Sequence, residues 1–481
     1  MLRYSEKTFG KVLLNYFVSF ICILSSVLIW FFQNYHGYEL LYTQPLLYLI
    51  VFIFVYSTII FEDNTRLFFI ILSGVSAIRY VLLPLLISFT EYYGGRSIVE
   101  PSSDSFFKAI LLMNYELLIT ALFIKIMEVR RNSKINTTDS NIKNQTFKLD
   151  HHHIGYIFFI LFTLIGITFF PSVLSFINII VPSSLSNNVE PSFIQNFILY
   201  CIIVSKQLIF IMLLKRMYKK YKLKKNRIYI SISFIISLVN IFIYFGTNRS
   251  DIIISAIVSF LLLYKLFGKI VKKYIIVGLV ILFFLVAIVS GARNYISISN
   301  GSNSIIDITD TFQVYTGGVY NVAIAIETKD YFPSSNDLSV LFFDIFRPMI
   351  GVNLLVKNLP FSYSNIFYNK RMWLNVDRRS QIIPMIGQGN LFFGFFLAPL
   401  FGMLLIRIYY YFEKILNNTN NLEIYYFLTL VVVRFGFFMG QNTMNIINDM
   451  SMNLVLFIMV YQINFTLHKI LGKKSYQIKY R

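Results

Sequence analysis

The chain has 481 residues, of which 56% are hydrophobic and 14% charged, and its mean hydropathy is +0.64. A soluble domain carries about 25% charged residues, so this composition excludes a soluble enzyme and also a disordered or fibrous chain. The formal net charge of +20 would suggest a nucleic-acid partner in a soluble protein, whereas in a membrane protein topology explains it. Cys22 and Cys201 lie inside apolar runs, so we expect neither a disulfide framework nor a metal site.

Apolar segments recur along the chain, and a helix that crosses a bilayer needs about 20 mostly apolar residues. The candidate spans are residues 12–33, 45–61, 67–88, 106–128, 154–174, 193–214, 228–246, 252–268, 274–291, 390–408, 423–440 and 450–468. The sequence therefore predicts an all-α integral membrane protein with about 12 transmembrane helices. Nine of them lie in residues 1–291, and three lie in residues 390–481 before a basic tail.

The distribution of Lys and Arg predicts the orientation, because these residues accumulate on cytoplasmic connections. With the N-terminus inside, 29 of the 43 basic residues fall on the inner side and 11 on the outer side. The largest inner cluster is the run KRMYKKYKLKKNR at 215–227, which we interpret as an anchor at anionic lipid. Both termini are therefore predicted to be cytoplasmic.

Residues 292–389 contain no spanning candidate and are predicted to form a large extracytoplasmic loop between helices nine and ten. Acidic residues predominate up to Phe346, and basic residues predominate from Arg347 onward. A basic half-loop outside suggests an anionic partner there, although long loops also translocate regardless of charge. The run SVLFFDIF predicts a short helix on the membrane surface or at the mouth of the bundle.

Away from the ends of the predicted spans, where charged side chains are rare and costly, lie four ionisable residues: Arg79, Glu116, Lys206 and Arg434. Structural pairing and a place on a substrate pathway are both open for Arg79 and Glu116, which can pair with each other. Arg434 is close enough to the outer end of its span to face a cavity open to the outside.

Arginines also gather at the predicted outer ends of several helices. Arg249 lies in the turn GTNRSD, Arg293 in SGARNY, and Arg378 and Arg379 in DRRSQIIPMIGQGN. The guanidinium group binds phosphate oxygens in a fork, and helix N-termini add backbone donors. These arginines and helix N-termini together suit the binding of a pyrophosphate at the outer surface. The alternative for Arg249 is a structural ion pair with Asp251.

The chain lacks the motifs H-E-x-x-H, G-x-S-x-G and Walker A, and His36 is the one histidine predicted to lie outside. A reaction catalysed on the outer side of the membrane would therefore rely on the side chains of carboxylates, arginines or hydroxyl residues. Catalysis by zinc is not expected there.

The segment order and several motifs resemble bacterial polysaccharide repeat-unit polymerases, the O-antigen and capsule polymerases of the Wzy type. The pieces that carry this resemblance are GTNRSD at 246–251, GARNY at 291–295 and QIIPMIGQGNLFFGFFLAPLFGMLL at 381–405. Arg378 and Gly389 also have the Arg-x10-Gly spacing described for outer loops of that family. The related O-antigen ligases carry a histidine in the large outer loop, and this loop has none.

The resemblance implies a glycosyltransferase in the bacterial cytoplasmic membrane that joins undecaprenyl-pyrophosphate-linked repeat units at the outer face. It implies lipid-linked glycans, membrane lipids, a chain-length regulator and a flippase as partners, without a cofactor or nucleic acid. The candidates for binding the pyrophosphate are Arg249, Arg293, Arg378, Arg379 and Arg434, and those for the base are Asp377, Asp251 and Asp344. The alternatives are a lipid-linked oligosaccharide flippase or transporter, and another membrane glycosyltransferase such as the O-antigen ligase.

Overall fold

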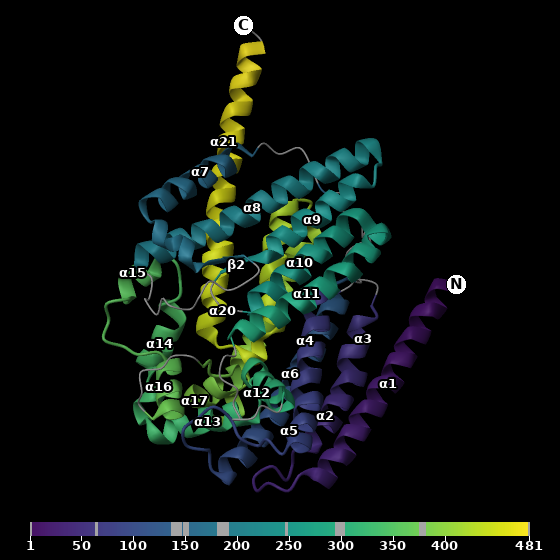
Figure 1. Cartoon of the computed structure of the whole chain (residues 1–481), viewed down its shortest axis with the longest axis vertical. Helices are drawn as coiled ribbons and strands as arrows, with labels where there is room; N and C mark the ends of the chain where they lie inside the picture. The colour runs from purple at the N-terminus through teal and green to yellow at the C-terminus, as the bar shows by residue number, and fades with distance from the viewer. Residues whose placement is uncertain are drawn as a thin grey trace. The chain divides into compact units, whose positions relative to one another are not determined.

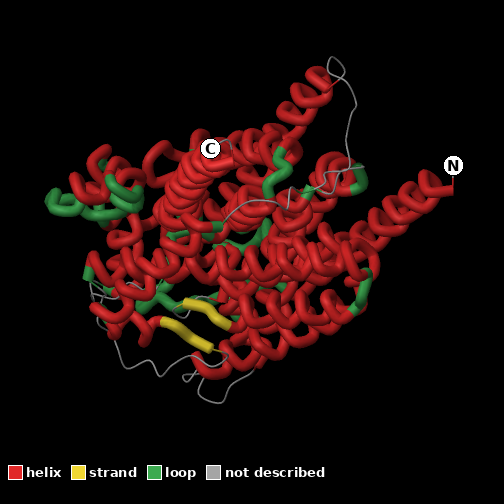
Figure 2. The backbone as a smooth tube through the Cα atoms, turned by 90° about the horizontal axis from the view of Figure 1, so that it is seen from above, coloured by secondary structure: helices red, strands yellow, loops and turns green. Residues whose placement is uncertain are grey.

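The computed structural model of the chain is almost entirely helical (Figures 1 and 2). It describes residues 2–62, 66–135, 147, 153–179, 192–245, 249–293, 304–374 and 381–479. The described residues divide into two compact units, each made of stretches that are distant in the sequence. Residues 1–142, 297–413 and 434–448 form unit 1, and residues 143–296, 414–433 and 449–481 form unit 2.

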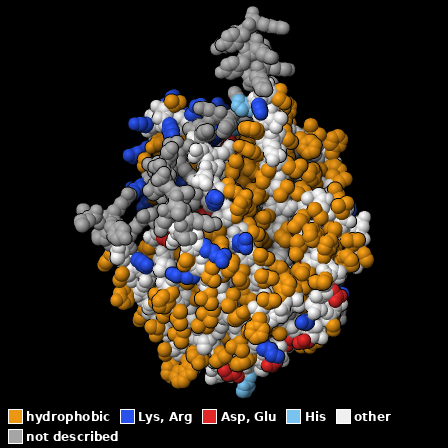
Figure 3. Space-filling view, turned by 180° about the vertical axis from the view of Figure 1, so that it is seen from behind, with side chains coloured by type: hydrophobic (Ala, Val, Ile, Leu, Met, Phe, Trp, Pro, Cys, Tyr) orange, Lys and Arg blue, Asp and Glu red, His pale blue; other side chains and the backbone are white. Residues whose placement is uncertain are grey.

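Six helical stretches among the described residues are long and apolar enough to cross a membrane. They are Thr8–Phe32, Thr43–Ile60, Leu67–Thr90, Ser103–Asn132, Ile194–Lys224 and Thr443–Ile470. Large apolar side chains such as Phe17 and Trp30 point outward from the first of them, as lipid-facing residues do. Hydrophobic side chains also cover broad areas of the face in Figure 3. The prediction of a helical, membrane-embedded protein therefore holds, while the count of about 12 spans stays a prediction.

The predicted span at 390–408 is not one continuous helix, because the chain bends by 101° between two helices there. These helices are α17, Met385–Leu397, and α18, Leu400–Asn418. Gly394 has φ 73° inside α17, a backbone conformation that favours glycine. Pro399 then lacks the N–H that a continuous helix would need at the start of α18. The arrangement is either a broken span or a re-entrant loop.

Unit 1 contains the N-terminal helices together with most of the predicted outer loop. Its first helices are α1 (Leu2–Phe32), α2 (Thr43–Val51), α3 (Ser57–Ile60), α4 (Leu67–Ala77), α5 (Leu83–Thr90) and α6 (Ser103–Ile135). Short π-helical turns at Phe52–Tyr56 and Ile78–Leu82 continue α2 into α3 and α4 into α5. The later helices are α12 (Ser304–Thr316), α13 (Val319–Tyr331), α14 (Leu338–Phe346), α15 (Val352–Val356), α16 (Ser364–Trp373), α17, α18 and α20 (Thr443–Asp449).

The described part of the long connection folds into five helices, α12 to α16, of which α12 and α13 pack onto apolar helices of unit 1. Helix α13 packs against α6, α16 and α17, and most of its side chains are buried. Helix α12 packs against α5. The run SVLFFDIF is helical, as predicted, and forms most of α14. The connection therefore supplies core elements of unit 1.

Unit 2 is built from apolar helices joined by one short β-ribbon. Its elements are α7 (Ile154–Phe169), β1 (Ile177–Ile179), α8 (Phe193–Lys224), α9 (Ile228–Phe242), β2 (Ile243–Phe245), α10 (Arg249–Phe267), α11 (Lys272–Arg293), α19 (Leu422–Gly436) and α21 (Leu456–Lys479). Strands β1 and β2 pair antiparallel and form a short ribbon within the otherwise helical unit (Figure 2). Ser192 and Gln195 form a capping box that fixes the start of α8.

Candidate functional site

The predicted site residues fall in both units and partly outside the described residues. Asp344 lies on α14 in unit 1, and Arg434 is buried near the end of α19. Asp251 is exposed in the first turn of α10 in unit 2. Arg249 is the first residue of α10 and Arg293 is the last residue of α11. For these two residues the structure describes the backbone. Asp377, Arg378 and Arg379 lie outside the described residues. The gathering of these arginines around one anion stays a prediction.

Asp344 is the centre of a buried hydrogen-bond network in unit 1. Its carboxylate accepts hydrogen bonds from the backbone N–H of Ser364 at 3.0 Å, from the Ser364 hydroxyl, and from Nε2 of Gln388 at 2.7 Å. Gln388 in turn accepts from the backbone N–H of Thr443 at 2.9 Å through Oε1. One carboxylate thus links α14, α16, α17 and α20, and the side chains of Asp344 and Gln388 are both buried.

This enclosure favours a positioning role for Asp344. Burial raises the pKa of its carboxyl to about 6, although the hydrogen bonds from Ser364 and Gln388 act in the opposite direction. A base that deprotonates a sugar hydroxyl must come within hydrogen-bond reach of that hydroxyl. Asp344 is 1% exposed, and its oxygens already accept hydrogen bonds from side chains of the protein. The arrangement holds the starts of α16 and α17 in a fixed relation.

Two asparagines on α16 fix the chain that leads into α17. The side chain of Asn369 donates to Gln381 O at 2.8 Å and accepts from Gln381 N at 3.1 Å. One turn earlier, Asn365 Oδ1 accepts from Ile383 N at 2.9 Å. Residues 381–383 therefore run antiparallel to α16. The described chain thus reaches Leu374 at the C-terminal end of α16 and resumes at Gln381 beside the same helix.

Asp344→Ala is expected to lower the free energy of unfolding by about 1–3 kcal/mol, because it leaves buried donors of Ser364 and Gln388 without an acceptor. The pKa of Asp344 rises from 3.8 to about 6 in the folded state. The folded state thus binds more protons between these values, and stability should fall as pH rises from about 4 to about 6.

Thermal unfolding of the detergent-solubilised protein across this pH range measures both effects. Asp337→Ala is the matched control, because Asp337 precedes the same helix, is exposed and makes no side-chain cap. Asp344→Asn should lose the pH dependence. Equal melting temperatures for Asp344→Ala and Asp337→Ala would contradict the positioning role.

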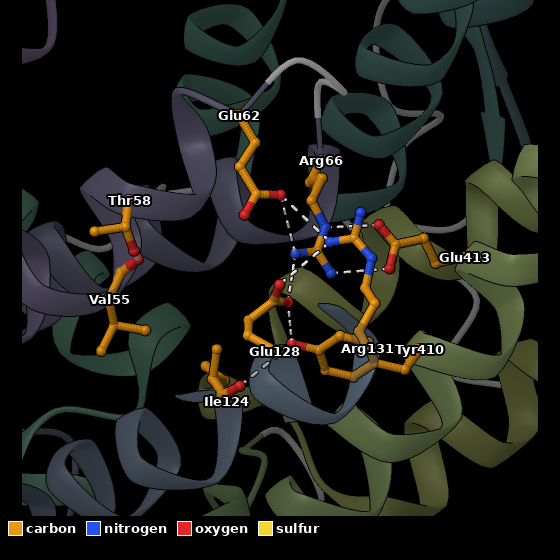
Figure 4. Close-up of polar contacts among 9 residues, drawn as sticks. All are labelled: Val55, Thr58, Glu62, Arg66, Ile124, Glu128, Arg131, Tyr410 and Glu413. Carbon is orange, nitrogen blue, oxygen red and sulfur yellow. Dashed lines mark hydrogen bonds and ion pairs between the residues drawn. The ribbon is translucent and has the colours of Figure 1, made fainter. Parts of the chain in front are cut away.

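A second polar cluster in unit 1 was not predicted (Figure 4). Arg66 lies just before α4 with its side chain buried. Its Nε and Nη2 donate to the two oxygens of Glu413 at 2.6 and 2.8 Å, and its Nη1 donates to Glu128. The guanidinium also lies over the Phe69 ring, 4.6 Å from its centroid. A bidentate pair of this kind has the geometry of the strong, charge-assisted class of hydrogen bond.

Further charged residues surround this arginine. Arg131 donates to Glu62 at 3.3 Å and to Glu128 at 3.2 Å, and the Tyr410 hydroxyl donates to Glu128 (Figure 4). With Arg66 and Glu413, the cluster holds three carboxylates and two guanidinium groups. It joins the end of α3, the start of α4, the C-terminal part of α6 and the middle of α18.

Three of the ionisable residues predicted inside the spans, Arg79, Glu116 and Lys206, have partners within their own units. Arg79 and Glu116 lie 2.9 Å apart, as the sequence suggested, and the Tyr80 hydroxyl donates to Glu116 at 3.3 Å. Lys206 donates to the backbone carbonyls of Asn240 and Ile243, at 3.0 and 2.8 Å, where α9 ends and β2 begins. These contacts favour structural pairing for Arg79, Glu116 and Lys206 over a substrate pathway.

Among the described residues, no group of histidine, cysteine and acidic side chains is arranged to hold a metal ion. No protein-family model, curated protein or solved structure matches the chain.

Proposed function

We propose that the chain is a glycosyltransferase that polymerises lipid-pyrophosphate-linked oligosaccharide repeat units at the outer face of a bacterial cytoplasmic membrane. Its support is the resemblance of the motifs at 246–251, 291–295 and 381–405 to repeat-unit polymerases. The observation that carries it is the anchoring of the chain on both sides of residues 375–380 to α16. Those residues include Asp377, Arg378 and Arg379.

The proposed reaction joins two lipid-linked glycans. A hydroxyl of the incoming repeat unit attacks the anomeric carbon of the growing chain, and the bond from that carbon to the pyrophosphate oxygen breaks. Undecaprenyl pyrophosphate leaves with the electron pair, and a carboxylate takes the hydroxyl proton. Arginines aimed at the leaving group stabilise the charge that develops on it. Because Asp344 is enclosed, Asp377 and Asp251 are the better candidates for the base.

The buried ion pairs bear on the flippase alternative. A flippase would use ionisable residues along a path through the bundle. Arg79 is instead bound to Glu116, and Lys206 to main-chain carbonyls, within their own units. This pairing favours the polymerase over transport.

The proposed topology has both termini in the cytoplasm and residues 292–389 outside, since 29 basic residues lie inside and 11 outside. In a variant without Cys22 and Cys201, a cysteine at Lys329 should react with a membrane-impermeant maleimide in intact cells. A cysteine at Lys220 should react only after the cells are opened. Labelling of both positions in intact cells would contradict the proposed topology.

Deletion of the gene tests the function itself. The mutant should accumulate single repeat units on the outer leaflet, on the lipid carrier or transferred singly to lipid A, and should lack long chains. Retention of repeat units on the cytoplasmic leaflet would instead assign the chain to the flippases.

A further inference from the structure

Residues 338–356 form an apolar stretch in the long connection, and the charged residues among them are Asp344 and Arg347. The structure folds this stretch into α14 and α15, which pack against each other at the edge of unit 1, on the side away from α1 (Figure 1). Helix α14 has nine residues and α15 has five. Because a helix needs about 20 residues to cross the hydrocarbon core, neither of them spans it.

Helix α14 is apolar on all sides, and its single charged residue is turned into the protein. Asp344 is buried together with Val340 and Phe343. On the outward side, Leu338 is 81% exposed and Phe342, one turn later, is 40% exposed. A helix that is hydrophobic all round is normally buried, either in a protein core or in a membrane. The outward side of α14 therefore suits an apolar surrounding.

Helix α15 adds further exposed apolar side chains. Leu354 is 53% exposed and Leu355 is 81% exposed, whereas the next residue, Val356, is buried. Single exposed leucines are normal on a soluble surface, but several large ones gathered on packed elements mark a contact with another apolar body. We call Leu338, Phe342, Leu354 and Leu355 the outer apolar surface.

The apolar body that unit 1 already contacts is the bilayer. Four of the six helical stretches that could cross a membrane belong to this unit. Helix α14 is also fixed to a membrane element, because Asp344 accepts from Gln388 of α17 at 2.7 Å. With α18, α17 forms the bent pair that together is long and apolar enough to be a broken span or a re-entrant loop. The outer apolar surface therefore continues a part of the chain that meets lipid.

The dimensions of α14 and the charge that follows it fit a segment that enters one leaflet and leaves it again. Nine helical residues rise about 13 Å, and one leaflet contributes about 15 Å of hydrocarbon. Arg347 follows the helix, and its guanidinium lies 5.7 and 5.9 Å from the ring centroids of Phe343 and Tyr363. Arginine can hold its charged end at the level of the headgroups while its stem contacts apolar groups.

We infer that the outer apolar surface lies among the acyl chains of the outer leaflet, so that α14 and α15 form a hairpin that enters the bilayer without crossing it. The inference goes beyond the proposed function, and only the choice of leaflet rests on the proposed topology. Because Asp344 ties α14 to Ser364 of α16 and Gln388 of α17, the hairpin also sets the depth of these two helices relative to the headgroups.

Fluorescence quenching in vesicles of phosphatidylcholine with brominated acyl chains tests the inference on the full-length protein. The chain has two tryptophans, so replacement of Trp30 and Trp373 by phenylalanine gives a background without this residue. In that background, Leu355→Trp and Leu338→Trp each place one reporter on the outer apolar surface. Both should emit less in brominated than in unbrominated vesicles, to an extent comparable with Phe17→Trp on the first candidate span.

Lys329→Trp is the matched control, because Lys329 is an exposed residue of the same connection and should contact water. Its emission should be quenched by aqueous iodide and unaffected by brominated lipid. Melting temperatures equal to that of the background show that the reporters leave the fold intact. If Leu355→Trp and Leu338→Trp responded to the two quenchers as Lys329→Trp does, the inference would be overturned.

A second copy of the chain is the competing occupant of this surface. It would shield both reporters from brominated lipid and from iodide. In a variant without Cys22 and Cys201, it would also let Leu355→Cys form disulfide-linked dimers on oxidation. Either result would overturn the inference.

The leaflet is decided by the labelling of a cysteine at Lys329. Quenching of both reporters by brominated lipid, together with labelling of that cysteine only in opened cells, would overturn the assignment to the outer leaflet. Long chains in the gene-deletion strain would refute the proposed function without affecting the quenching result.

Discussion

Arg249→Ala, Arg293→Ala and Arg378→Ala are each expected to abolish long polysaccharide chains while the protein stays at wild-type abundance in the membrane. A departing diphosphate carries more than one negative charge, and one donor aimed at a developing charge contributes about 10²–10³ in rate. Arg→Lys at the same positions should be partly active at most, because lysine matches the charge without the fork. Chain length on a gel, beside a blot for each variant, measures the effect.

The control for this series is Lys357→Ala, which changes an exposed basic residue of the same connection. Arg371 is unsuitable as a control, because it is buried and paired with Glu327. Its loss would leave a carboxylate without its cation. Wild-type chain lengths from both Arg249→Ala and Arg378→Ala would remove the pyrophosphate-binding hypothesis.

Arg66→Ala is expected to prevent accumulation of the folded protein. The substitution leaves Glu413 and Glu128 buried without the guanidinium that neutralises them, and breaking a buried pair costs about 3–5 kcal/mol. Arg131→Ala removes a more exposed arginine of the same cluster and should cost less than about 1 kcal/mol. Thermal unfolding in detergent and membrane abundance compare the two variants.

A double substitution refines this test. Arg66→Ala with Glu413→Ala should cost less than the sum of the two single substitutions, because the double variant buries one charge fewer than Arg66→Ala. Additive losses, or a melting temperature of Arg66→Ala equal to that of Arg131→Ala, would show that the cluster does not hold unit 1 together.

The sequence predicted features that depend on composition and local pattern. Long apolar runs have few structural solutions in a bilayer other than helices, so the helical class and most helix positions follow from hydropathy. The pairing of Arg79 with Glu116 was predicted for a related reason, because charges inside spans need partners. The bend in the predicted span at 390–408 was missed although Gly394 and Pro399 are visible in the sequence. Hydropathy averaged along a segment does not register a single backbone break.

Features that depend on contacts between distant segments could not be predicted. Arg66 is 62 residues from Glu128 and 347 from Glu413, and nothing in the sequence relates these positions. Asp344 was considered as a base because it is a carboxylate in the long connection. Its enclosure depends on Ser364 and Gln388, which reach it only after α14, α16 and α17 have packed.

Conversion of isolated lipid-linked repeat units by the purified protein tests the central claim most directly. The substrate is the single-unit lipid extracted from the gene-deletion strain, mixed with protein reconstituted in vesicles without any other enzyme. We predict a ladder of chains that differ by one repeat unit, with one undecaprenyl pyrophosphate released for each bond formed, and no ladder with Arg378→Ala. Single units that remain unextended with folded wild-type protein would contradict the proposed polymerase activity.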